Sequence, residues 1–271
     1  MSPVRELCEV LERRRVGEYQ ALTLAAPQIA ETARPGQFVH LLATEDRSFP
    51  LRRPFSLWRG SGATFEIVFD VVGAGTRALA GLGPHDVVDA LGPLGRAFDP
   101  PEAPAGCVLD GGGYGTAPLF FLATELRARG CRVDVLIGAA TAGRLLDAAA
   151  AERLGHSLTV TTDDGSAGRR GLVTDPLPEL LAGTGAERVY ACGPMPMLAA
   201  VSMVAAAAGV PCQVAVEEQM ACGTGICFSC VLPLGPEEPT RMARSCLEGP
   251  VFDGTAIAWV ELGYPELEPT A

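Results

Sequence analysis

Four cysteines near the end of the chain have the spacing of metal ligands. The stretch ACGTGICFSC contains Cys222, Cys227 and Cys230, and Cys246 follows after fifteen further residues. The pattern Cys-x4-Cys-x2-Cys with a distant fourth cysteine is that of plant-type [2Fe–2S] centres. Two glycines in the stretch permit the backbone turns with which a short loop can wrap a cluster and direct its N–H groups at sulfur. The sequence therefore predicts a [2Fe–2S] site with these four ligands.

Three other interpretations compete with the cluster. Structural zinc usually takes its ligands as two close pairs, whereas here three cysteines are grouped and one is distant. Buried cysteines without any ligand would have this spacing only by chance. A disulfide pair is disfavoured, because the chain has an odd number of cysteines, nine, and no apolar signal segment at its charged N-terminus. The remaining thiols lack such a context and are predicted to be core residues: Cys8, Cys107, Cys131 and Cys212.

A glycine-rich turn predicts a nucleotide site. The sequence GGGYG at 111–115 follows a predicted strand and precedes a predicted helix, where a pyrophosphate can bind backbone N–H groups. A tight strand-to-helix turn without a ligand needs glycine too. No acidic residue ends the next strand, so this is not the standard Rossmann fingerprint, and Asp110 adds a negative charge before the turn. The candidate residues are Gly111, Gly112, Gly113 and Gly115.

A second strand-to-helix junction carries Cys192, Gly193, Pro194 and Met195. The carboxyl ends of strands at such junctions face the crevice in which α/β sheets bind ligands. The other interpretation is a helix start with an incidental cysteine.

The first part of the chain contains a possible flavin motif, Arg53-Pro54-Phe55-Ser56, and a glycine-rich turn with Gly75 and Thr76. An arginine can pair with a phosphate, and a serine and backbone amides can hold flavin ring atoms. A proline at a strand entry and a glycine-rich hairpin would explain the same residues.

Three regions are expected to position these groups. Residues 1–100 read as short apolar runs between Gly and Pro, which predicts an antiparallel β-barrel. Residues 101–210 alternate strand and helix patterns, which predicts a parallel sheet. Residues 211–271 contain the cysteines and form a small third domain. The predicted fold class is thus β plus α/β, with an N-terminal barrel, a parallel-sheet nucleotide-binding domain and a C-terminal [2Fe–2S] domain.

Composition excludes several functions. A net charge of −11 disfavours binding to nucleic acid. The absence of lysine excludes Schiff-base chemistry and a P-loop. Three scattered histidines offer little for a histidine metal site or a triad. The longest apolar stretch, 201–210, is too short to cross a bilayer. We therefore expect a cytoplasmic protein without a membrane partner.

Together the motifs resemble the ferredoxin-reductase superfamily, and within it most the electron-transfer subunits of two-component bacterial dihydroorotate dehydrogenase. They run in the family's order over nearly the whole chain, and the last two are the most specific. The motifs are RPFS at 53–56, GAGT at 73–76, GGGYG at 111–115, TDDG at 162–165, ACGPMPML at 191–198, EEQMACGTGICFSC at 217–230 and RSCLEGPVFDG at 244–254.

The resemblance implies three cofactors. It implies a [2Fe–2S] cluster on the four cysteines and NAD near the glycine turn and Cys192–Met195. It implies FAD on the barrel, in contact with Arg53, Pro54, Phe55, Ser56, Val68, Phe69, Asp70, Gly75 and Thr76. The implied partner is an FMN-containing catalytic subunit that oxidises dihydroorotate in pyrimidine biosynthesis, in a heterotetramer of two of each. Electrons would pass from FMN through the cluster and FAD to NAD+, without a general acid or base in this chain.

Other functions remain open from sequence. A reductase of the same superfamily that serves an oxygenase, a hydrogenase or a ferredoxin system would share all the cofactors. A redox sensor has no use for a complete nucleotide domain, and a zinc-stapled binding module would be colourless. Asp163 and Asp164 at a strand end favour NAD over NADP, whereas Arg144, Arg169 and Arg170 could attract a 2′-phosphate.

Overall fold

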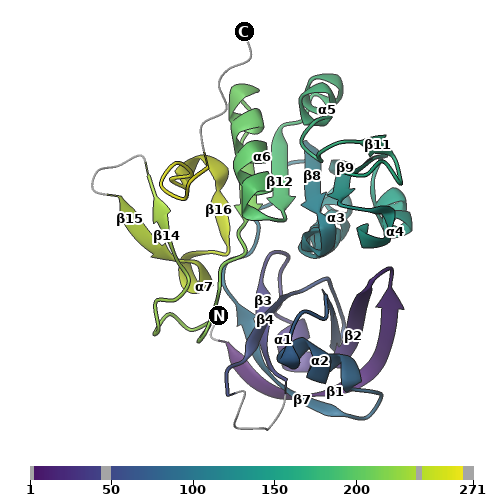
Figure 1. The fold of residues 1–271 in the computed structure, drawn as a ribbon, viewed down its shortest axis with the longest axis vertical. Helices are drawn as coiled ribbons and strands as arrows, with labels where there is room; N and C mark the ends of the chain where they lie inside the picture. Colours follow the sequence, from purple (N-terminus) through teal and green to yellow (C-terminus); the bar gives the residue numbers. More distant parts are fainter. Residues whose placement is uncertain (1–2, 44–49, 236–239, 265–271) are drawn as a thin grey trace.

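The computed structural model contains two seven-stranded sheets and a two-stranded sheet within the residues that it describes, 3–43, 50–235 and 240–264 (Figure 1). The barrel strands lie together at one end of the molecule, and the second sheet with its helices lies at the other. The cysteine-containing segment lies at the side of both (Figure 1).

The first sheet curls around its own core. Its order is β4-β3-β7-β1-β2-β6-β5, and all neighbouring strands are antiparallel. The edge strands β4 and β5 are joined by only Leu57 and Trp58. The Leu57 N–H donates to Gln37 O at 3.2 Å, and the Trp58 N–H donates to Glu66 O at 2.8 Å. The chain thus passes from one edge of the sheet to the other through two residues that each remain paired with a neighbouring segment, and the sheet forms the predicted antiparallel barrel. The elements are β1 (Val4–Val16), β2 (Tyr19–Ala25), α1 (Pro27–Ala30), β3 (Phe38–Leu42), β4 (Arg53–Ser56), β5 (Arg59–Ser61), β6 (Thr64–Phe69), α2 (Ala74–Gly81) and β7 (Val87–Leu94).

The second sheet has the order β11-β10-β9-β8-β12-β13-β16, and all its pairs are parallel except β13 with β16. Strands β8 and β9 are almost continuously buried because helices cover both faces. Helices α3 and α4 cover the face toward the barrel, and α5 and α6 cover the other. The elements are β8 (Gly106–Gly112), η1 (Gly113–Thr116), α3 (Ala117–Ala128), β9 (Arg132–Ala139), η2 (Ala142–Arg144), α4 (Ala148–Leu154), β10 (Ser157–Thr162), β11 (Arg169–Arg170), α5 (Leu177–Thr184), β12 (Arg188–Cys192), α6 (Met195–Ala207), β13 (Cys212–Ala215) and β16 (Val251–Asp253).

The C-terminal region is divided between this sheet and a separate segment. Strand β13 pairs with β12, and β16 returns to pair with β13. The boundary predicted between 210 and 211 therefore separates β13 from its own sheet, because composition changes at Pro211 whereas main-chain pairing continues to Ala215. We propose residues 217–249 as the third unit and call them the cluster segment. It carries β14 (Val231–Leu234), β15 (Arg241–Arg244) and α7 (Ser245–Glu248), and η3 (Gly254–Ala256) follows β16.

One hydrophobic core continues from the barrel into the α/β domain. Trp58 of the barrel meets Phe120 of α3 with ring centroids 6.4 Å apart, and Tyr19 of β2 meets Tyr114 at 5.7 Å. The Arg59 guanidinium lies over Trp58 and also pairs with Asp147 at 3.1 Å. These contacts fix the two domains against each other. No helix in the described ranges is both long and apolar enough to cross a membrane.

Asp110, in β8, is fully buried, and its carboxylate oxygens have no hydrogen-bond partner within the described ranges. Burial raises the pKa of this carboxyl well above the usual 3.8. Strand alternation places it with Val108 on the sheet face that α5 and α6 cover. Burial thus favours the neutral form of this carboxyl, which argues against the negative charge predicted for it beside the nucleotide site.

The Asp110 carboxyl makes stability depend on pH. Its pKa is higher in the folded than in the unfolded chain, so stability falls as pH rises from 3.8 toward the folded value. Asp110→Asn cannot ionise, so its loss in free energy of unfolding between pH 5 and pH 8 should be smaller than that of wild type, by about 1.4 kcal/mol for each unit of pKa difference removed. Urea unfolding at both pH values measures this.

Asp134→Asn is the matched control, because Asp134 is equally buried but paired with Arg132 and Ser157. It should lower stability at both pH values. An Asp110→Asn variant that loses as much stability as wild type over this range would contradict the prediction.

Candidate functional site

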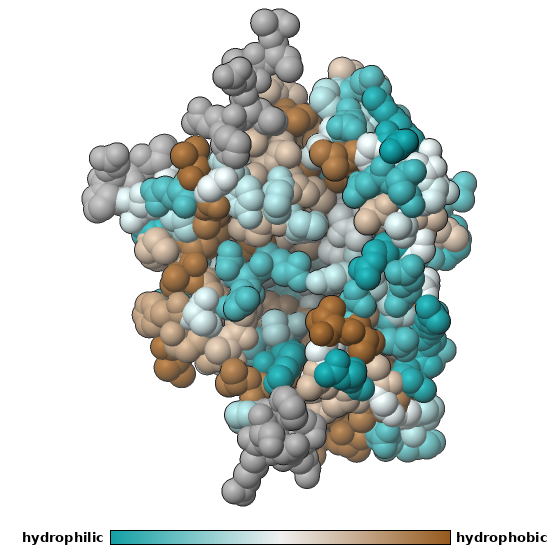
Figure 2. Space-filling model, in the orientation of Figure 1, coloured by the Kyte–Doolittle hydropathy of each residue, from teal (hydrophilic) through white to brown (hydrophobic). Residues whose placement is uncertain are grey.

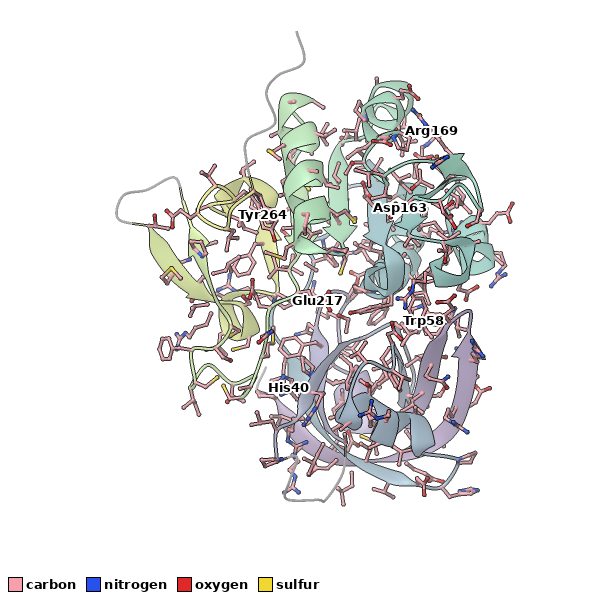
Figure 3. The ribbon with its side chains drawn as sticks, in the orientation of Figure 1. His40, Trp58, Asp163, Arg169, Glu217 and Tyr264 are labelled. Atoms are coloured by element: carbon pink, nitrogen blue, oxygen red, sulfur yellow. The ribbon has the colours of Figure 1, made fainter. Side chains whose placement is uncertain are left out.

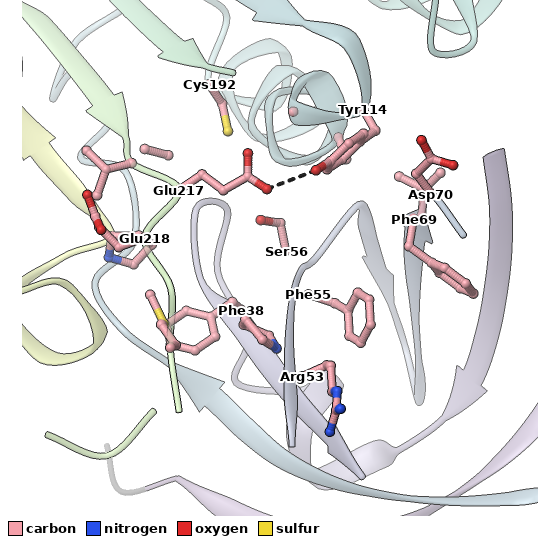
Figure 4. A pocket seen from close by; sticks show the side chains of 18 of the residues that line it. Phe38, Arg53, Phe55, Ser56, Phe69, Asp70, Tyr114, Cys192, Glu217 and Glu218 are labelled. Atoms are coloured by element: carbon pink, nitrogen blue, oxygen red, sulfur yellow. Dashed lines mark hydrogen bonds between the residues drawn. The ribbon is translucent and has the colours of Figure 1, made fainter. Parts of the chain in front are cut away.

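A deep cavity lies where the barrel, the α/β domain and the cluster segment meet (Figure 4). It encloses about 1050 Å³ of space free of protein atoms, open solvent at its mouth included. We call it the first cavity. All but one of the predicted flavin contacts line it: Arg53, Pro54, Phe55, Ser56, Val68, Phe69, Asp70 and Thr76. The exception, Gly75, packs against Arg53, since a Cβ there would lie 2.6 Å from Arg53 Nε.

The chemistry of this cavity suits FAD. Arg53 and the N-terminus of α2 lie together and offer a cation and free backbone N–H groups to a pyrophosphate. Thr76 stabilises the turn before α2, because its Oγ1 accepts hydrogen bonds from the N–H groups of Val72 and Gly73, both at 3.0 Å. The apolar walls, which include Phe38 and Phe69, suit a flat ring system.

Among the polar side chains that line this cavity, three come from different elements and lie near its boundary with the α/β domain (Figure 4). They are Ser56 of β4, Cys192 at the end of β12, and Glu217 just after β13. Glu217 accepts a hydrogen bond from the Tyr114 hydroxyl at 3.0 Å. Burial, and secondarily the charge of Glu217, raises the pKa of Cys192 far above its usual value. Cys192 is therefore a neutral thiol and not a nucleophile.

A second cavity opens on the other side of Tyr114. Of the residues predicted for the nucleotide, Gly112, Gly113, Gly115 and Pro194 line it. Cys192 lines the first cavity, as Gly115 also does. Gly111 and Gly193 pack against other protein atoms, and Met195 packs against the core between the sheet and α6.

Close packing explains much of the glycine requirement. A Cβ on Gly115 would lie 2.8 Å from Gly193 Cα, and a Cβ on Gly112 would lie 2.6 Å from Met197 Sδ. The two strand-to-helix turns thus press against each other, and only glycine permits this approach. The glycines at 111–115 thus serve a tight strand-to-helix turn and can also serve a bound pyrophosphate. The same packing places the N-termini of both helices at the second cavity.

The two cavities meet at Tyr114 and Glu217, which line both together with Gly115. Tyr114 rests edge-on against Tyr19, whose hydroxyl donates to Arg144 O at 2.9 Å. Ligands in the two cavities could therefore come into direct contact at this junction. Sequence reasoning missed Glu217, Tyr19 and Met220 as lining residues, and only the acidic pair before the cysteines gave a signal.

The cysteine loop, residues 221–230, is built to hold a thiolate. Gly223 and Gly225 have φ values of 67° and 79°. The N–H groups of Thr224 and Ile226 each donate to Cys222 Sγ at 3.4 Å. Burial alone would raise the pKa of Cys222, but hydrogen bonds from the backbone of Cys227, Thr224 and Ile226 and from the Cys227 side chain lower it to about 6.

The four thiols lie as two pairs. The Cys227 side chain affects the pKa of Cys222, and the Cys230 thiol affects that of Cys246, so the thiols are neighbours two by two. Within the described ranges no three His, Cys, Asp or Glu side chains converge on one metal ion. A [2Fe–2S] centre takes two ligands at each of its two irons, so one thiol pair for each iron is compatible with this arrangement.

The second pair is buried against the barrel. Cys230 and Cys246 pack with Phe38 and Leu94 in one apolar cluster, whereas Cys227 is exposed. Burial, followed by the neighbouring Cys230 thiol, raises the pKa of Cys246 to about 12. Bound iron would supply the positive charge that deprotonates it. The other thiols predicted as core residues, Cys8, Cys107, Cys131 and Cys212, are all buried.

Comparisons with known proteins agree with this geometry. A family model described as the iron-sulfur cluster binding domain of dihydroorotate dehydrogenase B matches residues 217–258. Two relatives are described as electron transfer subunits of dihydroorotate dehydrogenase B (NAD(+)). One, from Desulforamulus reducens, is 37% identical over 86% of this chain and 90% of its own length. The other, from Geobacillus thermodenitrificans, is 39% identical over 92% and 96%.

Solved structures share the fold. An NADH-dependent reduced ferredoxin-NADP oxidoreductase, described in terms of flavin-based electron bifurcation, superposes with a TM-score of 0.83 at 29% identity, over 95% of this chain and 91% of that one. A ferredoxin NADP+ reductase from Neisseria gonorrhoeae gives a TM-score of 0.62 at 17% identity, over 77% and 92%. At that identity the second likeness concerns the fold alone.

The pairing of thiols predicts the effect of losing one of them. Cys246→Ser leaves Cys230 without its partner, so iron and acid-labile sulfide per chain should fall by about tenfold or more in anaerobically purified protein. Cys131→Ser is the control, since Cys131 is also buried but lies in the core under α3. Equal iron content in the two variants would contradict the assignment.

Proposed function

Because this chain belongs to the family of electron transfer subunits of dihydroorotate dehydrogenase B (NAD(+)), we propose that it carries electrons from a catalytic partner subunit to NAD+ by way of a [2Fe–2S] cluster and FAD. One observation supports this most. The four thiols, the first cavity and the second cavity are contiguous. Phe38 packs with Cys230 and Cys246 and also lines the first cavity, and Tyr114 and Glu217 line both cavities.

The order of the three sites matches the chemistry required. A flavin exchanges single electrons with a cluster and a hydride with a nicotinamide, so it belongs between them. In this assignment Arg53 and the α2 N-terminus hold the FAD pyrophosphate, and the turns at 112–115 and 193–194 hold that of NAD. Ser56, Cys192 and Glu217 border the place where the two rings would meet (Figure 4).

The surface around the cysteine loop suits a protein partner. Ile226, Phe228, Met242 and Leu247 are 79%, 59%, 54% and 43% exposed. Leu247 packs on Gly225, and Phe228 is covered on one face by the Arg244 guanidinium at 5.1 Å. Figure 2 shows hydrophobic side chains over this part of the molecule, where Figure 1 draws β14, β15 and α7. An apolar surface beside an electron-transfer centre supports docking of the catalytic subunit here.

In this proposal the partner carries FMN, oxidises dihydroorotate, and assembles with this chain as a heterotetramer of two of each. The cluster held by the four cysteines would accept electrons from this partner at the apolar surface, and the FAD held in the first cavity would pass them to NAD+. The assembly stoichiometry and the FMN rest on the resemblance of the sequence motifs alone.

A second candidate has its own observation. The solved oxidoreductase with a TM-score of 0.83 works with ferredoxin and both pyridine nucleotides. A reductase subunit that serves a ferredoxin system would use the same three sites. The two candidates differ in the protein that docks on the apolar surface.

Titration of the full chain with the dihydroorotate-oxidising catalytic subunit separates these two functions. The full chain, mixed with the catalytic subunit, is expected to reduce NAD+ when dihydroorotate is added, and NADH alone should bleach its flavin. Ile226→Ser should weaken the complex by about tenfold without changing the bleaching by NADH. The measurements are the apparent dissociation constant and the rate of NADH formation.

Val87→Ser is the matched control. Val87 is 59% exposed but lies at the opposite end of β7 from Leu94, which packs with the cysteines. Bleaching by NADH without dihydroorotate-dependent turnover in the mixture would reject the first function and favour the second. Equal weakening by the two variants would reject the docking surface.

The position of Asp163 in the second cavity supports NAD over NADP. Asp163 lines that cavity, whereas Asp164 hydrogen-bonds to Ser166. Arg169 lies outside it and faces Glu179 at 3.6 Å. Arg144 also lines the cavity, but Asp70 at 3.1 Å and Glu18 at 3.3 Å balance its charge. A 2′-phosphate would thus meet a net negative surface.

Removal of the Asp163 charge should relax this preference. Asp163→Asn is expected to raise kcat/KM for NADPH about fivefold, which corresponds to about 1 kcal/mol of repulsion, and to leave that for NADH nearly unchanged. Asp164→Asn serves as the control and should change neither value. An unchanged ratio of NADH to NADPH efficiency in Asp163→Asn would contradict the inference.

A further inference from the structure

His40 is a completely buried histidine whose ring nitrogens have no hydrogen-bond partner in the part of the chain that the structure describes. Strand alternation in β3 explains its direction. Val39 and Leu41 point into the barrel core, so Phe38 and His40 point out of it. Figure 3 shows His40 at the side of the barrel that faces the cluster segment.

The His40 ring lies directly on the cysteine loop. A Cβ on Gly223 would come within 2.7 Å, 2.8 Å and 2.9 Å of Cε1, Nε2 and Nδ1 of the ring. Gly223 follows Cys222, so the ring touches the loop beside the first thiol pair. On its other side the ring meets Phe38, at 5.6 Å between centroids, and Phe38 packs with Cys230 and Cys246.

His40 is held neutral in this position. Burial, and secondarily the nearby Arg52 guanidinium, lowers the pKa of its ring to about 4. A neutral imidazole keeps one N–H donor. Buried donors are almost always paired, so a fully enclosed N–H without an acceptor indicates that one is supplied by a bound group.

Resting on the proposed [2Fe–2S] site, we propose that His40 donates a hydrogen bond to a sulfur of that cluster and so raises its reduction potential. The ring meets the loop backbone at Gly223 and the side chain of Phe38, which itself packs with Cys230 and Cys246, and the nearby Arg52 guanidinium offers no acceptor. Reduction adds negative charge to the cluster and its sulfurs, so a donor stabilises the reduced form more than the oxidised form.

The strand neighbours of His40 show on which side of the proposed cluster it lies. Its register partner in β4 is Pro54, which lines the first cavity, and its register partner in β7 is Leu91, which packs near the thiols. The residue therefore lies on the flavin side of the cluster, away from the exposed apolar surface. It is a positioning and tuning residue for electron transfer from the cluster to FAD.

Isotope labelling tests the hydrogen bond in the unaltered protein. The chain has three histidines. His85 pairs with Glu9 on the barrel surface, and His156 accepts the Val133 N–H in the α/β domain. Pulsed EPR of the reduced cluster in the full chain, labelled with 15N-histidine, should therefore detect a weak nitrogen coupling from His40 alone. The coupling should vanish in His40→Phe and persist in His85→Phe.

A redox titration tests the effect on potential. His40→Phe keeps a flat ring but has no donor, and it should lower the equilibrium constant for one-electron reduction of the cluster about tenfold, or 59 mV. His40→Gln keeps an N–H donor and should restore most of the loss. His85→Phe should match wild type.

The outcomes separate this proposal from the function on which it rests. Wild-type protein without iron and sulfide would overturn both. A loaded cluster without 15N coupling, or with the same potential in wild type and His40→Phe, would overturn the role of His40 and leave the proposed function intact. If His40→Phe binds less iron, the labelled wild-type protein still decides.

Discussion

The arrangement of the three sites depends on one main-chain closure. The cluster segment leaves the second sheet at Val216 and returns at Pro250, and the Val216 N–H donates to Pro250 O at 2.9 Å. The barrel joins at the same place, since the Arg96 N–H donates to Gly249 O at 2.5 Å. This junction joins the two ends of the cluster segment to each other, to the second sheet and to the barrel. Glu217 and Met220 are thereby held in the wall of the first cavity, and the buried thiol pair is held against the barrel.

Local chemistry made part of the site predictable. The spacing of the cysteines follows from the need of a short loop to supply three thiols, and the structure pairs Cys222 with Cys227 and Cys230 with Cys246. Residues 53–56 and 68–70 also line one cavity, and their residue types suit a phosphate and a flat ring. The barrel and the parallel sheet follow from strand lengths and from the alternation of strand and helix.

Long-range relations were not predictable. His40 and Gly223 are far apart in sequence, and nothing in the apolar run around His40 indicates contact with the cysteine loop. In the sequence Tyr114 is simply one residue of the glycine-rich turn, yet its hydroxyl donates a hydrogen bond to Glu217 at the junction of the two cavities. The pairing of β16 with β13 is likewise long-range, since β16 returns to this sheet only after the whole cluster segment. Such pairings are decided by tertiary packing rather than by local pattern.

Exposure of Cys227 has a consequence for the life of the free subunit. Its thiol and the surrounding Ile226 and Phe228 are open to solvent, whereas Cys230 and Cys246 are enclosed. Dissolved oxygen would thus reach a cluster held by these thiols from the side of Cys227. A partner seated there would act as a shield as well as an electron source, and the order of assembly would set how long the centre survives in air.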